Sequence, residues 1–165
     1  MELIMTPGSS KGFTLVELMI VIALLVILSV IAVPGFNTLV RDNRIQSQAE
    51  EFNALLQYAR SEAVIRKVPV QVAIDAAAGS IEVSARGEPL RTTTLTLGGV
   101  DFRASASQLG YRPNGTATVP DFRSTFCRDD DAGTGLLLTV SGSGSTTLHH
   151  KGQNATGGSL GSCTP

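Results

Sequence analysis

The sequence has no tryptophan and few charged residues, which make up 16% of its 165 residues. Lysine and arginine number 13 against 14 aspartates and glutamates, so the chain lacks the positive charge of a typical nucleic-acid-binding protein. Its two cysteines do not form a C-x-x-C motif, which excludes the common cysteine-based zinc and redox motifs. A hydrophobic content of 42% with so little net charge excludes a disordered chain. The length predicts one folded domain, or two at most.

The sequence also lacks the short motifs of common enzymes. It has no Ser-His-Asp signature, no phosphate-binding glycine loop and no H-E-x-x-H pair. His149 and His150 are neighbours, so in a strand they point to opposite faces and cannot easily share a metal ion. Asp129, Asp130 and Asp131 lack the alternating spacing of a calcium loop and favour a solvated turn. We therefore expect no enzyme activity, no catalytic residue, no cofactor and no metal site.

A long apolar run is present from Phe13 to Val33, and Glu17 is its only charged residue. A helix of that length matches the hydrocarbon core of a membrane, which is about 30 Å thick. A secretory signal peptide has a shorter apolar core and then a cleavage site with small residues, whereas this run meets Pro34 and continues as an amphipathic pattern. A buried core helix is the alternative. The run predicts a membrane-spanning helix over residues 13–34.

Glu17 is the informative residue of this run. A carboxylate inside a membrane span costs about 2.5 to 3.5 kcal/mol on insertion scales, so it should have a partner. One alternative is that Glu17 lies close enough to the end of the run to reach the lipid headgroups. The other is that it awaits a cation, supplied by another chain or by a newly exposed N-terminal amine.

The residues KGFTLVE, at positions 11–17, lead directly into the apolar run. Together they resemble the class III signal of type IV prepilins and type II secretion pseudopilins. The resemblance implies that a prepilin peptidase cuts between Gly12 and Phe13, removes the leader of residues 1–12, and methylates the new amine of Phe13. It also implies a role in subunit assembly for Glu17, which would neutralise the N-terminal amine of a neighbouring subunit as a filament is built.

An amphipathic continuation of the helix is predicted over residues 35–68. Pro34 lies inside the helical pattern, where it removes a backbone hydrogen bond, so we expect a helix kink near it. The helix should end near Lys67, because Val68 precedes a proline. The expected apolar face consists of Ile45, Ala49, Phe52, Leu56, Ala59 and Ala63. The opposite face, either solvated or in contact with neighbouring subunits, holds Arg44, Gln48, Glu51 and Glu62.

A β-domain is predicted over residues 69–165, where the hydrophobic period changes to two. Alternation over residues 70–74 and 81–83, with a turn between them, predicts a hairpin. The connections are too short for parallel crossovers, so the strands should be antiparallel. The expected fold class is α+β, a long N-terminal helix packed on a C-terminal antiparallel β-domain. Further strands are expected at residues 90–97, 100–104, 108–112, 121–127, 135–140 and 145–150.

The two cysteines, Cys127 and Cys163, are compatible with one disulfide if this part of the chain leaves the cytoplasm. Such a bond would contribute about 4 kcal/mol in the chain-entropy model. It would hold a glycine-rich tail that is too polar to hold itself in place.

Two further segments narrow the resemblance. NALLQYARSEA, at residues 53–63, and YRPNG, at residues 111–115, resemble a helix segment and a turn of the H-type minor pseudopilins and the FimT and FimU minor pilins. This implies a minor pilin of a type IV pilus, a structural subunit of the membrane-assembled initiation and tip complex that primes pilus assembly. The implied location is the bacterial inner membrane with the head in the periplasm, and then the pilus, at its tip. The implied partners are the membrane, the prepilin peptidase, the inner-membrane assembly platform, and other minor pilins and the major pilin through the N-terminal helix.

Two alternatives stay open: a minor pseudopilin of a type II secretion system, and a DNA-binding minor pilin for natural transformation. FimT-like relatives contribute to DNA uptake through a basic C-terminal region, but the corresponding residues 141–145 here read SGSGS, without arginine. Binding to phosphates requires several basic contacts, so the charge distribution does not favour DNA. The remaining arginines that we considered for DNA are scattered among acidic residues: Arg86, Arg91, Arg103, Arg112, Arg123 and Arg128.

Overall fold

The computed structural model describes residues 12–165, so residues 1–11 of the predicted leader lie outside the described residues. A long helix, α1 (Leu15–Arg66), precedes all the strands. The chain divides into two compact units with the boundary between Leu39 and Val40. The first unit contains the apolar part of α1, and the second, which we call the head, contains the rest of α1 and both sheets. The expected α+β fold class is confirmed.

The helix is assigned without interruption from Leu15 to Arg66, including position 34. The kink expected at Pro34 stays a prediction. The helix ends beside Lys67, as expected, and Lys67 has a φ of 56° in the left-handed region. That conformation is common for the first residue after a helix.

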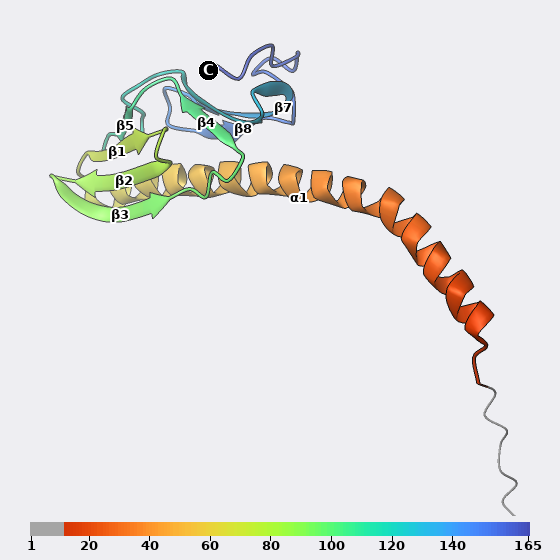
Figure 1. Cartoon of the computed structure of the whole chain (residues 1–165). Coiled ribbons are helices and arrows are strands. Elements are labelled where there is room, and N and C mark those ends of the chain that lie inside the picture. Colours follow the sequence, from red (N-terminus) through yellow and green to blue (C-terminus); the bar gives the residue numbers. More distant parts are fainter. Residues whose placement is uncertain (1–11) are drawn as a thin grey trace, which may run out of the picture. The chain divides into compact units, whose positions relative to one another are not determined.

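The head contains two four-stranded antiparallel sheets, with strand orders β3-β2-β1-β5 and β4-β6-β7-β8. Figure 1 shows both sheets beside the part of α1 that belongs to the head. The first sheet consists of β1 (Val70–Asp75), β2 (Ser80–Ala85), β3 (Glu88–Thr94) and β5 (Gln108–Tyr111). The second consists of β4 (Asp101–Ala104), β6 (Phe122–Arg128), β7 (Asp131–Val140) and β8 (Thr146–Leu148).

The apolar face of α1 packs into the core of the head, as predicted. Phe52 is at its centre, because its ring centre lies 5.3 Å from that of Phe102 and 5.9 Å from that of Phe126. Phe102 and Phe126 stack on each other at 4.7 Å. Aromatic pairs of this geometry contribute about 0.5 to 1.5 kcal/mol beyond the area that they bury. The predicted face residues are all buried: Ile45, Ala49, Phe52, Leu56, Ala59 and Ala63.

One residue of the expected polar face is buried instead. Gln48 is only 7% exposed, and its side-chain oxygen has no hydrogen-bond partner among the described residues. The expectation was wrong because Gln48 is three residues after Ile45 and four before Phe52, which places all three on one helix face. Of the other residues expected there, Arg44 donates a hydrogen bond to the Gly98 carbonyl at 2.7 Å.

The hairpin between β6 and β7 explains why β7 begins at Asp131 rather than at Gly135. Arg128 pairs with Asp131, so Asp129 and Asp130 form a two-residue turn. Their φ angles are 52° and 57°. Favoured hairpin turns need positive φ at both central positions, which aspartate tolerates better than most residues. β8, in contrast, ends at Leu148, so His149 and His150 lie beyond the strand that we expected to contain them.

The predicted disulfide between Cys127 and Cys163 is confirmed. It attaches the tail to sheet β4-β6-β7-β8, where the Thr125 hydroxyl donates to the Cys163 carbonyl at 2.5 Å. Gly135 lies beneath this attachment. A Cβ added there would be 2.7 Å from Cδ2 of Leu160 and 2.8 Å from Sγ of Cys127, which the disulfide holds in place.

Asp42 fixes the beginning of the head's helix to the same region. Its Oδ1 lies 3.2 Å from Nη1 of Arg128, and its Oδ2 lies 2.6 Å from Nζ of Lys151. One carboxylate therefore joins α1 to β6 and to the segment after β8.

We predict that Gly135→Ala destabilises a fragment of residues 40–165 by about 1 to 3 kcal/mol, the usual cost of overpacking. Gly142→Ala is the matched control, because its Cβ would meet nothing nearer than 3.9 Å. The measurement is urea unfolding of both variants beside the parent fragment. Equal stability of the two variants would contradict the close packing of the tail on β7.

Candidate functional site

Thr14 and Glu17 form a capping box at the start of α1. The Thr14 hydroxyl accepts a hydrogen bond from the backbone N–H of Glu17 at 3.2 Å. In return, Oε2 of Glu17 accepts from the Thr14 N–H and from the Thr14 hydroxyl, both at 3.1 Å. Reciprocal bonds of this kind satisfy donors at the helix N-terminus that have no partner within the helix. The carboxylate thus has a partner in its own chain on one oxygen, and no described residue donates to the other.

The predicted cleavage site lies directly before this box. Phe13 is 88% exposed. A Cβ added to Gly12 would meet no atom within 4 Å, so nothing in the described chain itself requires glycine there.

The described side chains of the first unit are mostly apolar and exposed. Its large hydrophobic side chains from Leu15 to Leu39 are exposed wherever the structure describes them. Among the described helices, α1 is long and apolar enough to cross a membrane. The Ser29 hydroxyl donates to the Leu25 carbonyl at 2.7 Å, so this polar group is satisfied within the helix. Such internal satisfaction is what a lipid environment demands.

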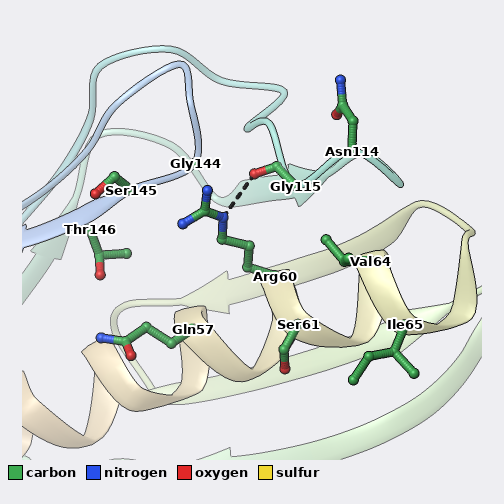
Figure 2. Close-up of a pocket in the computed structure, with 10 residues that line it drawn as sticks. All are labelled: Gln57, Arg60, Ser61, Val64, Ile65, Asn114, Gly115, Gly144, Ser145 and Thr146. Atoms are coloured by element: carbon green, nitrogen blue, oxygen red, sulfur yellow. Dashed lines mark hydrogen bonds between the residues drawn. The ribbon is translucent and has the colours of Figure 1, made fainter.

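A groove of about 520 Å³ lies in the head at the C-terminal end of α1 (Figure 2). One wall is the turn at residues 112–116 and the other is the turn at residues 141–145. The helix forms the floor between them. The lining residues are Gln57, Arg60, Ser61, Val64, Ile65, Asn114, Gly115, Gly144, Ser145 and Thr146.

Arg60 holds the two turns together. Its Nε donates to the Gly115 carbonyl at 3.0 Å, and its Nη2 donates to the Ser143 carbonyl at 3.0 Å. The turns also touch directly, because a Cβ on Gly144 would lie 2.0 Å from the Gly115 oxygen. Gly144 has a φ of 80°, so both space and backbone require glycine at this position.

Tyr111 lies at the end of β5, directly before the first of these turns, and is fully buried. Its hydroxyl has no hydrogen-bond partner among the described residues. Burial raises the pKa of Tyr111 to about 12, because the charged phenolate is poorly solvated there. The positive charge of Arg60 opposes this rise.

Several of the arginines named for DNA binding, and His149, have contacts within the chain. Arg103 pairs with Asp130 at 3.1 Å, Arg128 pairs with Asp42, and Arg91 lies over the Tyr58 ring. Nε2 of His149 lies 3.0 Å from the Thr139 hydroxyl, and burial, with a smaller effect of His150, lowers the pKa of His149. Within residues 12–165, no group of three His, Cys, Asp or Glu side chains is placed to hold a metal ion.

The family described as type II transport protein GspH matches residues 48–144, which run from the middle of α1 to the second wall of the groove. The chain belongs to the GspH family. The prokaryotic N-terminal methylation motif matches residues 8–33 of this GspH-family chain, across the predicted cleavage site and the whole apolar run. No curated protein sequence matches the chain.

Solved structures with the same fold include proteins from two bacteria. The type IV minor pilin FimU of Pseudomonas aeruginosa is 27% identical, with a TM-score of 0.63 over 73% of this chain and 96% of FimU. A second crystal form of FimU gives 25% identity and a TM-score of 0.61 over 72% of this chain and 98% of FimU. The minor pseudopilin EpsH from the type 2 secretion system of Vibrio cholerae shares the fold, at 18% identity and a TM-score of 0.53, over 67% of this chain and 99% of EpsH.

The resemblance to pilin-like proteins of the H type is therefore confirmed. This GspH-family chain carries the N-methylation motif on a membrane-anchoring helix, and its family implies assembly with other pilins. Sequence reasoning missed two features. The T-x-x-E spacing of the capping box was visible in the sequence, whereas the role of Arg60 was not, because both of its acceptors are distant in the chain.

We predict that Tyr111→Phe does not destabilise the head fragment at neutral pH, because it removes a buried hydroxyl that has no partner. In the unfolded state Tyr111 ionises near pH 10, whereas its pKa in the folded head is about 12. The parent fragment should therefore lose stability as the pH rises from about 10 to about 12, because the unfolded state releases the Tyr111 proton first. The variant should lose less. Urea unfolding at pH 7 and at several values above 9 measures both effects, and a pH dependence unchanged by the substitution would refute this assignment.

Proposed function

We propose that this chain is a minor pilin of a type IV pilus, a structural subunit of the membrane-assembled complex that primes pilus assembly and ends at the pilus tip. One observation carries the proposal. An N-methylation motif and a long exposed apolar helix are joined, in one chain, to a head whose fold covers 96% of the minor pilin FimU.

The comparisons support the pilus over the secretion system. Identity to FimU is 27% with a TM-score of 0.63, against 18% and 0.53 for EpsH. The minor pseudopilin of a type II secretion system is the second candidate, since EpsH has the same fold. We also propose that the protein is not an enzyme.

The proposed sequence of events begins in the inner membrane, with the head in the periplasm. A prepilin peptidase cuts after Gly12 and methylates Phe13, which leaves a positive amine two residues before the start of α1. The assembly platform then brings subunits together. The Glu17 oxygen without a hydrogen bond in its own chain accepts one from the N-terminal ammonium group of a neighbouring subunit. The attraction between these two charges is strong because the surrounding helices are apolar.

Glu17 both caps the helix and carries a negative charge, and one substitution can remove the charge while keeping the cap. Glutamine at position 17 keeps a capping box but carries no charge. We expect Glu17→Gln to be cleaved normally and to be recovered in sheared filaments at less than about a tenth of the parent level, a loss of about 1.4 kcal/mol or more in assembly. The measurement is an immunoblot of membrane and filament fractions. Normal recovery would show that Glu17 serves only the helix.

Gly12→Val tests the cleavage step itself. The chain's own structure has open space at this position, so the variant should fold and insert normally. We expect an uncut precursor, seen as a slower band, and no incorporation into filaments. Cleavage at the normal rate would contradict the assigned site.

The function is tested by sheared pilus yield from a strain that lacks the gene, with and without the full-length gene restored. A loss that the gene restores is the expected result. An unchanged yield would overturn the pilus assignment, and secretion and transformation assays on the same strain would then distinguish the two alternatives.

A further inference from the structure

The groove at the end of α1 carries a cation without a counter-charge. Arg60 is the one charged residue among those that line it, and no acidic residue lines it. Two nitrogens of its guanidinium bind backbone carbonyls, and no described residue accepts a hydrogen bond from the third, Nη1. The salt bridges of the described chain all involve other basic residues: Arg66, Arg103, Arg128 and Lys151.

Beside Arg60 the head exposes two large hydrophobic side chains, whereas most of its other large hydrophobic side chains are not exposed. Ile65 is 73% exposed and Val64 is 46% exposed, on consecutive positions of α1. Among the described residues from Val40 onward, the other exposed large hydrophobic residue is Val40 itself, at the boundary of the head. Apolar surface that is concentrated at one polar-rimmed groove marks a contact with another molecule.

These features select the chemistry of the occupant. A fixed guanidinium with a free N–H group suits a carboxylate, and Val64 and Ile65 suit an apolar side chain next to it. A nucleic-acid backbone would use the cation but not the apolar pair, and would need more than one basic contact. The polar groups of Asn114, Ser145 and Gln57 can satisfy the backbone of a protein segment.

We infer that this groove is a docking site for the head of a different pilin-like subunit of the same complex, which inserts an acidic side chain beside Arg60 and an apolar side chain against Val64 and Ile65. The inference rests on the proposed function, because it takes the occupant to be another subunit of the same filament. It assigns the end of α1 to a contact between heads, separate from the contacts made by the apolar helices.

The test is photo-crosslinking in living cells that express the full chain. A benzophenone amino acid replaces Ser61, an exposed groove residue, or Ala78, an exposed residue of the β1–β2 turn that serves as the control. We expect a product from position 61 that contains a different subunit with its own N-methylation motif, joined near an aspartate or glutamate. Position 78 should give no such product. Capture only of a second copy, of a protein without that motif, or of DNA would overturn the proposal.

Ile65→Asp tests whether the groove itself makes the contact. Its side chain is largely exposed, so the head should fold, which resistance to protease with an intact disulfide verifies. We expect the added negative charge to repel the acidic partner and to reduce crosslinking from position 61 at least tenfold. Ala78→Asp adds the same charge in the control turn and should leave crosslinking unchanged. Unchanged crosslinking in Ile65→Asp would refute the docking site.

Pilus yield separates this inference from the proposed function. If deletion of the gene abolishes sheared pili but folded Ile65→Asp protein restores them fully, the function stands and the groove contact is refuted. If deletion leaves the pilus yield unchanged, the proposed function fails whatever the crosslinking shows.

Discussion

Burial of one face of α1 is the interaction on which the head depends. Both sheets lie beside the part of α1 that belongs to the head, and Phe52 inserts among aromatic side chains of β4 and β6. Packing of these rings restricts how the helix can rotate against the sheets. The remaining face of the same helix is then fixed in its direction, so the exposed Val64 and Ile65 and the half-buried Arg60 occupy defined positions at the groove.

A single helix therefore has two environments along its length. Its first part exposes large hydrophobic side chains along its length, which suits lipid or a bundle of like helices, whereas its second part buries one hydrophobic face in the core of the head. Glu17 at one end and Arg60 near the other are each held by contacts within the chain and each retain an unused bonding position.

Periodicity and length were enough to predict the helix, its apolar face and the antiparallel strands. The disulfide was predicted from the even number of cysteines, on the condition that this part of the chain leaves the cytoplasm. Two expectations, the exposure of Gln48 and the start of β7 at residue 135, were wrong because residue type alone does not fix burial or turn position. Gln48 is polar by type but lies on the buried face by position, and the β6–β7 hairpin needed a positive φ that two aspartates supply. The groove could not be predicted at all, because it depends on two turns that α1 brings together across 55 and 83 residues of sequence.

The same long separations affect when the groove appears during folding. Contacts between residues far apart in sequence form only after the intervening chain has become ordered, because each long loop costs entropy to close. The Arg60 bonds enclose β1 to β5 in one case and β1 to β7 in the other, so we expect each bond to close after the strands that it encloses have formed. A half-folded head has an apolar helix end but no groove. Docking at this site would therefore accept only subunits that have finished folding.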